Sequence, residues 1–408
     1  MNILIVCEHA SDKFGGEAML PLNYFKLLSK TDNQVYLVTH ERVRSRLDFL
    51  EGINKDNIHY LPDTPLHKLI FKTRKILPDR VYTRTFGALL HFVTQYYQRK
   101  TVKKLVSQLN IDVVHEPAPV SATQPSAMYD VGTSVLIGPL NGGMSFPDEF
   151  KDMSGKIEVI IYSLAKYLDN IFNRILPGKR KANLILVANE RTKQALPSCI
   201  KAPVEILVEN GSFGTAKQDR EYKNKEIINV LYVGRLVDWK CVDIVIEAVA
   251  NLGSNVSVTI VGDGPDRKKL EALAEKNQLS NIQFTGLIPH KEVNNFYDNA
   301  DIFILPSIRE CGGAVVLEAM SRGLAVIATD WGGPADYITP STGFLIAPQS
   351  REYMVTEFSN AIKTLAENPS LREKVGIAAI QRIEQHFLWN KKIEQIIAYY
   401  RQISRNIK

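Results

Sequence analysis

Short apolar runs alternate along the chain with longer amphipathic segments that carry most of the charge. The first apolar run covers residues 2–7, and a glycine pair, a helical pattern up to residue 28 and a second apolar run at 35–38 follow. This order predicts an α/β domain with a parallel sheet, because parallel neighbours need a crossover that a helix supplies. Further strands are predicted at 111–114, 135–137 and 184–187.

The same alternation begins again after residue 205. A polar, charge-rich stretch at 217–225 precedes a second series of apolar runs, and the chain ends in helical patterns. With 408 residues, the chain exceeds the size of one typical core. We therefore predict two Rossmann-like α/β domains that face each other across a cleft, with a boundary near residue 205. The second set of strands is predicted at 228–233, 256–261, 282–284, 302–305, 325–328 and 343–346.

The segment 309–320 is the most informative part of this second series. A buried strand at 302–305 leads into a loop with Glu310, and Gly312 and Gly313 stand where the next helix begins. Glycine lets a ligand approach the backbone, and the free N–H groups of a helix start attract anions. Glu318 lies within that helix, so a ligand with both phosphate and hydroxyl groups fits, as in a nucleotide-sugar. Alternatively, Glu310 caps the helix and Glu318 faces solvent.

Other candidate residues follow strand ends, where ligands bind in open α/β sheets. Arg235 and Lys240 come after the strand 228–233 and could hold a diphosphate, although such a pair can also be an ordinary surface pair. His115 ends the strand 111–114, where it could contact substrate or serve the structure alone. Gly15 and Gly16 occupy the first strand-to-helix turn, as ligand contacts or as turn residues.

Several function classes are disfavoured by what the sequence contains. The four cysteines, at positions 7, 199, 241 and 311, have no metal-type spacing, and no serine-hydrolase elbow or P-loop motif is present. No apolar run approaches the roughly 18–20 residues that span a bilayer. The N-terminus has no signal-peptide pattern, and scattered cysteines are typical of free thiols in a reducing compartment. We predict a cytoplasmic protein that binds no nucleic acid.

The positive charge is concentrated in one half of the chain. Lys and Arg outnumber Asp and Glu by 26 to 19 in residues 1–200, whereas the remainder has 24 against 25. Residues 64–108 are the extreme, with ten basic residues, one acid and many interleaved apolar side chains. Such a segment can lie on an anionic membrane surface, which would make the protein peripheral on a membrane's cytoplasmic face. The alternative is a solvated helical face whose apolar side belongs to the core.

Taken in order, these motifs resemble the GT-B fold retaining glycosyltransferases of family 4. The resemblance covers most of both predicted domains. It rests on Glu310 and Glu318, separated by seven residues that include the glycine pair, and on a series of motifs in matching order. These are Gly15-Gly16, His115-Glu116-Pro117, Asn210-Gly211, Gly234-Arg235 with Lys240, the segment 262–265, Gly286, Pro306-Ser307 and the segment 323–333.

The resemblance implies a role for each domain and residue. Residues 1–205, joined by a last helix at 389–408 that crosses back, would bind the acceptor, and residues 206–388 would bind the nucleotide-sugar. Glu310, His115, Arg235 and Lys240 would be catalytic. Donor contacts would come from Gly15, Gly16, Arg235, Lys240, Leu287, Glu310, Gly312, Gly313, Ala314, Val315 and Glu318.

The implied reaction is transfer of a hexose, with retention of configuration, to a hydroxyl acceptor in glycolipid, polysaccharide or other glycoconjugate synthesis. UDP-sugars are the favoured donors and GDP-mannose comes second; neither a metal nor a cofactor is required. Cys311 departs from the pattern, since an aromatic residue is common there, so donor contacts can differ. Two alternatives are a membrane-binding protein with a degenerate GT-B fold, and a Rossmann-type oxidoreductase, which the missing GxGxxG motif disfavours.

Overall fold

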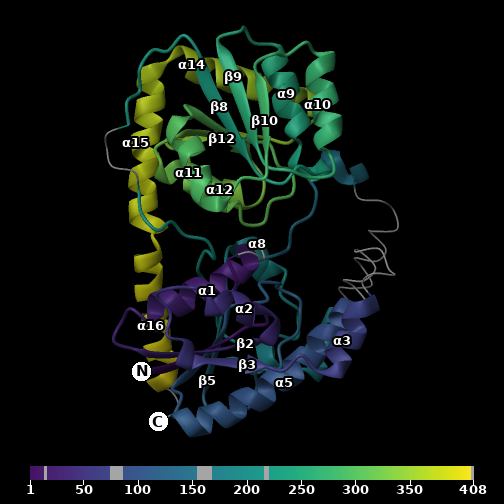
Figure 1. The fold of residues 1–408 in the computed structure, drawn as a ribbon, viewed down its shortest axis with the longest axis vertical. Helices are drawn as coiled ribbons and strands as arrows, with labels where there is room; N and C mark the ends of the chain where they lie inside the picture. The colour runs from purple at the N-terminus through teal and green to yellow at the C-terminus, as the bar shows by residue number, and fades with distance from the viewer. Residues whose placement is uncertain (13–15, 74–85, 154–167, 216–219, 406–408) are drawn as a thin grey trace. The chain divides into compact units, whose positions relative to one another are not determined.

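The computed structural model describes residues 1–12, 16–73, 86–153, 168–215 and 220–405. These residues form two compact units, each built on its own parallel sheet with helices (Figure 1). The predicted α/β class with two Rossmann-like sheets is confirmed. Unit 1 comprises Met1–Gly143, Ile160–Glu209 and Lys392–Lys408, and unit 2 comprises Met144–Val159 and Asn210–Lys391.

Unit 1 contains a seven-stranded sheet in the order β3-β2-β1-β4-β5-β6-β7, and its paired strands run parallel. The central strands are buried from end to end because helices cover parallel sheets on both faces. The strands are β1 Asn2–Val6, β2 Gln34–His40, β3 Ile58–Leu61, β4 Val113–Glu116, β5 Ser134–Leu140, β6 Leu184–Val187 and β7 Val204–Ile206. The helical elements are α1 Gly16–Leu28, η1 Glu41–Val43, α2 Arg44–Asp48, η2 Lys55–Asn57, α3 Pro65–Lys72, α5 Phe86–Leu109, α7 Gly178–Lys181 and α8 Glu190–Gln194.

The last helix, α16 (Trp389–Arg405), starts in unit 2 and continues into unit 1. Its residues from Lys392 onward belong to unit 1, where Tyr400 is fully buried and the Ser134 hydroxyl donates to the Ile403 carbonyl at 2.9 Å. The core of unit 1 is therefore completed by residues of α16.

Unit 2 contains a six-stranded sheet in the order β10-β9-β8-β11-β12-β13. Its strands are β8 Ile228–Val233, β9 Val256–Val261, β10 Ile282–Gly286, β11 Ile302–Leu305, β12 Ala325–Thr329 and β13 Gly343–Ile346. The helical elements are η4 Asp148–Met153, η5 Asp238–Lys240, α9 Val242–Ala250, α10 Arg267–Lys276, α11 His290–Asn299, α12 Ala314–Ser321, α13 Gly333–Tyr337, α14 Arg351–Glu367 and α15 Pro369–His386. Since β11 pairs with β8 and β12, the loop after β11 lies at the middle of the sheet's carboxyl edge.

The segment Met144–Met153 belongs to unit 2, whereas the predicted boundaries put it in the first domain. Two contacts hold it there. The Arg309 guanidinium lies 5.1 Å from the centre of the Phe146 ring, and the Trp331 indole N–H donates to the Ser145 carbonyl at 2.9 Å. Contacts of this kind join residues about 160 to 190 positions apart, and a pattern read along the sequence contains no signal for them.

Candidate functional site

Glu310 and Lys240 lie together at the carboxyl edge of the sheet in unit 2. The Lys240 Nζ and the Glu310 Oε2 form a close ion pair, and both side chains are about 15% exposed. The loop after β8 is held in place by the loop after β11, since the Ile308 N–H donates to the Trp239 carbonyl at 3.1 Å. The structure thus brings together an acid and a base that are 70 residues apart in sequence.

Glu310 also contacts the start of helix α12. Its Oε1 accepts a hydrogen bond from the Gly313 N–H at 3.2 Å. Gly313 has φ of 64° and is the N-cap of α12, with no side-chain cap hydrogen bond, and the following Ala314 is exposed. The helix start therefore presents backbone N–H groups beside a lysine, which is an arrangement that suits an anionic ligand.

A second glycine pair fixes the backbone of the Glu310 loop. The Gly333 N–H donates to the Glu310 carbonyl at 2.8 Å. A Cβ atom at Gly332, where φ is 74°, would lie 2.2 Å from that carbonyl oxygen. Only glycine permits this close approach without movement of the loop. The loop after β12 thus supports the loop after β11.

The loops after β8, β9 and β10 also pack backbone against backbone. The Leu236 N–H donates to the Asp263 carbonyl at 3.0 Å, and the Gly262 N–H donates to the Gly286 carbonyl at 3.0 Å. A Cβ at Gly262 would lie 1.9 Å from the Gly234 carbonyl oxygen. This packing leaves the Arg235 side chain exposed at the same edge as Lys240.

Glu318 lies one helical turn beyond the start of α12 and is half-buried. Its Oε2 accepts a hydrogen bond from the phenol of Tyr297 at 2.9 Å, and Tyr297 is 1% exposed. Leu287, in the loop after β10, is 82% exposed. Tyr297 has no signal in the sequence, because a tyrosine in a helix is indistinguishable from an ordinary core residue until its hydroxyl partner is known.

His115 lies in the core of unit 1, in contrast to the position proposed from the sequence. It is fully buried, its Nε2–H donates to the Gly138 carbonyl at 2.6 Å, and its Nδ1 accepts from the Tyr400 hydroxyl at 2.7 Å. Burial lowers the pKa of His115 to about 4, so the ring is neutral at pH 7. Because both nitrogens have protein partners, we do not include His115 in the donor site proposed below.

The predicted glycines of the first loop have different outcomes. Gly16 is the first residue of α1 and is exposed, and a Cβ there would meet no atom within 4 Å. Gly15 lies outside the described residues.

Of the basic segment 64–108, residues 64–73 and 86–108 are described. Across the described ranges of the chain, no helix is both long and apolar enough to cross a membrane.

Comparison with known proteins places these features in a family. The sequence model for glycosyl transferases group 1 matches residues 215–382. One component of the phosphatidylinositol N-acetylglucosaminyltransferase of Arabidopsis thaliana is 31% identical over 374 residues, which are 90% of this chain and 75% of that protein. The alpha-D-kanosaminyltransferase of Streptomyces kanamyceticus is 28% identical over 242 residues.

Other relatives match over a smaller part of their length. The chain spans 61% of the kanosaminyltransferase and 30% of the sulfoquinovosyl transferase of Arabidopsis thaliana, so less than two thirds of either. Among solved structures, Anabaena HepE in complex with UDP gives a TM-score of 0.68 at 16% identity, with 98% of this chain and 100% of that chain covered. Sucrose-phosphate synthase from Thermosynechococcus elongatus gives a TM-score of 0.67 at 18% identity, with 98% of each chain covered.

Proposed function

Because the chain belongs to the group 1 glycosyl transferases, with the GT-B fold, we propose that it moves a hexose from a nucleoside-diphosphate sugar to a hydroxyl acceptor. The observation that carries this proposal is the Lys240–Glu310 pair beside the start of α12. In the proposal, unit 2 binds the donor and unit 1 binds the acceptor.

The chemistry to be catalysed is departure of a nucleoside diphosphate, which gains negative charge as the glycosidic bond breaks. Positive charge or dipoles at one edge of the sheet come from Lys240, Arg235 and the N–H groups of Gly312, Ala314 and Val315. The Gly313 N–H, which donates to Glu310 in the free protein, joins them when the diphosphate displaces that carboxylate. Such groups stabilise the departing phosphate more than the bound substrate. With two cations and a helix start available, the proposed reaction needs no divalent metal.

Each acid has a separate role in the proposal. Glu310 contacts the sugar near the reacting carbon. It pairs with Lys240 in the free protein, and a bound diphosphate would share that lysine. Glu318 accepts hydrogen bonds from the ribose hydroxyls, and the exposed Leu287 packs on the base. We further propose retention of the anomeric configuration by attack from the face of the leaving group.

UDP-sugars are the favoured donors, and GDP-mannose is second. Anabaena HepE has been solved with UDP-glucose, which supports a uridine nucleotide in this fold. A thermal-shift panel of UDP, GDP, ADP and the corresponding nucleotide-sugars tests which nucleobase the donor carries. We expect the largest stabilisation from the uridine compounds, because a ligand that binds the native state raises the melting temperature. If no nucleotide in the panel raises it, the donor site is misassigned.

Two further measurements test the reaction itself. The anomeric configuration of the product, read by proton NMR, should equal that of the donor sugar. Turnover should persist in EDTA, and a loss that Mg²⁺ or Mn²⁺ restores would contradict the metal-independent proposal. Acceptors carried on lipids should be included, because the Arabidopsis relative is named for phosphatidylinositol.

A second function, docking on an anionic membrane, is favoured by exposed apolar side chains on α3 and α5. Leu66, Leu69 and Phe71 of α3 are 47%, 64% and 44% exposed, and Leu89 and Tyr96 of α5 are 48% and 64% exposed. The same two helices carry exposed lysines, so apolar and basic groups occur together as in interfacial helices. The exposed lysines are Lys68, Lys72, Lys100, Lys103 and Lys104.

Co-sedimentation with vesicles tests this surface. We expect binding to vesicles that contain phosphatidylserine, weaker binding in high salt, and weaker binding after Lys103→Glu and Lys104→Glu together. Lys276→Glu, on α10 of unit 2, is the matched control. Binding that neither salt nor the double variant reduces would contradict docking through these helices.

A further inference from the structure

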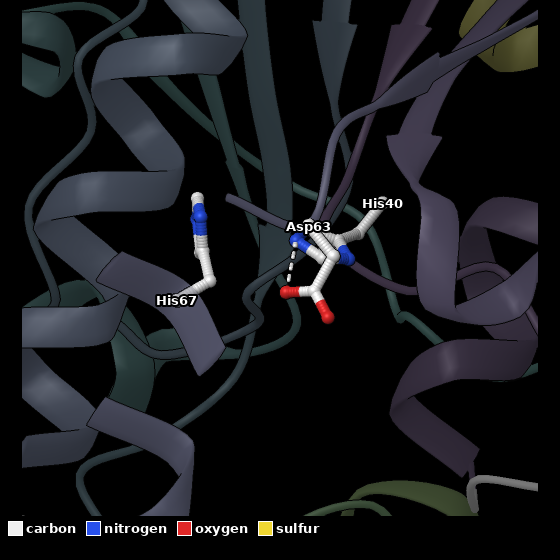
Figure 2. Close-up of side chains that lie close together, drawn as sticks. All are labelled: His40, Asp63 and His67. Carbon is white, nitrogen blue, oxygen red and sulfur yellow. Dashed lines mark ion pairs between the residues drawn. The ribbon is translucent and has the colours of Figure 1, made fainter. Parts of the chain in front are cut away.

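A polar cluster occupies the carboxyl edge of the sheet in unit 1, remote in sequence from every residue of the proposed donor site. His40 ends β2, Asp63 follows β3, and His67 lies in the first turn of α3. One ligand atom from each lies within 4.8 Å of the others (Figure 2). Within the described part of the chain, this is the group whose geometry would allow a metal ion.

The hydrogen bonds of His40 identify its protonated nitrogen. Its Nδ1 accepts from the Arg42 backbone N–H at 3.3 Å. Burial and the Arg42 charge lower the pKa of His40 to about 4, so the ring is neutral at pH 7 with its proton on Nε2. That Nε2–H is buried without a hydrogen-bond partner, and its distance of 3.9 Å from the Asp63 Oδ1 is too long for a hydrogen bond.

His67 has the same tautomer. The Thr94 hydroxyl donates to the Leu90 carbonyl, so it accepts from the His67 Nε2–H at 3.3 Å. The His67 Nδ1 accepts from the Thr64 hydroxyl at 2.7 Å. Both imidazoles therefore present N–H groups at Nε2 and have occupied lone pairs at Nδ1, which disfavours a metal. The Arg42 guanidinium, 2.8 Å from Asp63, adds a positive charge that also disfavours one.

We propose that His40 and Asp63 form a subsite for a hydroxyl group of a polyhydroxylated acceptor, either a sugar or a polyol. This inference rests on the proposed function. A hydroxyl oxygen can accept from the His40 Nε2–H while its hydrogen is donated to the Asp63 carboxylate. A phosphate dianion cannot donate to Asp63, and an ammonium group cannot accept from His40, so the pair selects a hydroxyl.

The surroundings fit a neutral ligand of this kind. The Arg42 guanidinium offsets the Asp63 charge, and these two side chains are 21% and 23% exposed, so the subsite opens to solvent through them. The His40 nitrogen itself is buried, so the proposed hydroxyl reaches it only when the Asp63 side chain moves aside. Glu8 and His9 follow β1 at the same edge of the sheet, which is where open α/β sheets bind ligands. Burial raises the pKa of the Glu8 carboxyl to about 7, and such shifts are common in binding sites.

Histidine NMR of the intact protein tests the subsite without knowledge of the natural acceptor. With ¹⁵N-labelled histidine, the His40 ring should show the Nε2–H tautomer. Titration with glucose, N-acetylglucosamine and myo-inositol should shift its resonances, and the comparison of the pyranoses with the cyclitol separates a sugar from a polyol. Spectra that never respond to these compounds would mean that a water molecule alone occupies the position, which would overturn the proposal. Zn²⁺ binding that shifts the resonances of both the His40 and the His67 ring would also overturn the proposal.

Variants give a second measurement. Asp63→Asn should weaken binding of the responding sugar or polyol by at least about tenfold, the loss expected for one hydrogen bond to a charged group. His59→Phe on the neighbouring β3 is the control and should leave binding unchanged. Stabilisation by UDP should be the same in all three proteins. If UDP fails to stabilise any of them, the proposed function fails, whereas a normal UDP response without sugar binding overturns this subsite alone.

Discussion

Tyr297 donates its phenolic hydrogen to the Oε2 of Glu318 across 2.9 Å, from a side chain that is 1% exposed. Burial and the neighbouring Glu318 carboxylate raise the pKa of Tyr297 well above its ordinary value, so the phenol stays protonated and remains a donor. Tyr297 therefore restricts the orientation of a carboxylate that we propose binds the ribose.

Tyr297→Phe should weaken UDP binding about fivefold, roughly the free energy of one net hydrogen bond, with little change in kcat. Calorimetry with UDP and 3′-deoxy-UDP is the measurement. The variant should discriminate less between the two ligands, which a general loss of stability would not cause. Tyr353→Phe, an exposed tyrosine of α14, is the control. Equal discrimination in the variant and the native protein would show that the Tyr297–Glu318 hydrogen bond has no role in ribose recognition.

Lys240→Ala and Glu310→Gln should each lower the rate of sugar transfer by at least about tenfold, the loss typical of one group that stabilises developing charge. The alanine variant should also bind UDP more weakly, because a cation near the phosphates is lost. Lys276→Ala, an exposed lysine of the same unit, serves as the control. Native rates in both variants would show that the ion pair has a structural role only.

Gly262→Ala should destabilise unit 2 by about 1–3 kcal/mol, because φ at Gly262 is 140° and the new Cβ would lie 1.9 Å from the Gly234 carbonyl oxygen. Thermal or urea unfolding measures the loss. Gly253→Ala is the matched control: its Cβ would lie 3.2 Å from the Asn255 side chain, and its φ is outside the left-handed region. Equal stability of the two variants would contradict the tight packing of these loops.

Acidification should destabilise unit 1 through its buried histidines. The His91 Nε2–H donates to the Pro125 carbonyl at 2.9 Å, and burial lowers the pKa of His91 to about 4. In the unfolded chain the His91 imidazole binds a proton near pH 6.5, whereas in the folded chain it does not. The contribution of His91 to the free energy of unfolding is therefore complete above pH 6.5, and it is lost as the pH falls toward 4.

His91→Gln should remove this dependence, since glutamine can still donate to the Pro125 carbonyl but does not titrate. Between pH 7 and pH 5, the native protein should lose about 2 kcal/mol more unfolding free energy than the variant. Comparing the two proteins cancels the opposite contributions of buried acids, such as Glu116, whose pKa is raised by burial. Parallel stability curves for the two proteins would show that His91 is accessible to protons in the folded state.

Local patterns along the sequence contain most of the information that determines the two sheets. The run of apolar residues at 302–305 is a fully buried strand, and Glu310 and Gly313 follow it as the pattern predicts. The grouping of Lys240 with Glu310 could also be anticipated, because each follows a strand end and the parallel strands β8 and β11 pair. Parallel pairing alone places such loops at one edge.

The environment of His115 could not be predicted in this way. Its position at a strand end favours contact with a ligand, but Tyr24 of α1 and Tyr400 of α16 pack against its ring at 5.0 and 5.7 Å between ring centres. Tyr400 is 285 residues away in sequence. Burial of a polar side chain depends on such distant partners, and the unpartnered Nε2–H of His40 is hidden from sequence analysis for the same reason.

The position of Tyr400 in unit 1 has a consequence for biosynthesis. Proteins made of several domains usually fold in order from the N-terminus as the ribosome releases them. Here the buried His115 and the Ser134 hydroxyl obtain their partners from residues 400 and 403, which are made 285 and 269 residues later. Unit 2, which consists of Met144–Val159 and Asn210–Lys391, can complete its core while the first unit to emerge still lacks part of its own. Until residues 400 and 403 are made, unit 1 is thus exposed to chaperones and proteases as an unfinished domain.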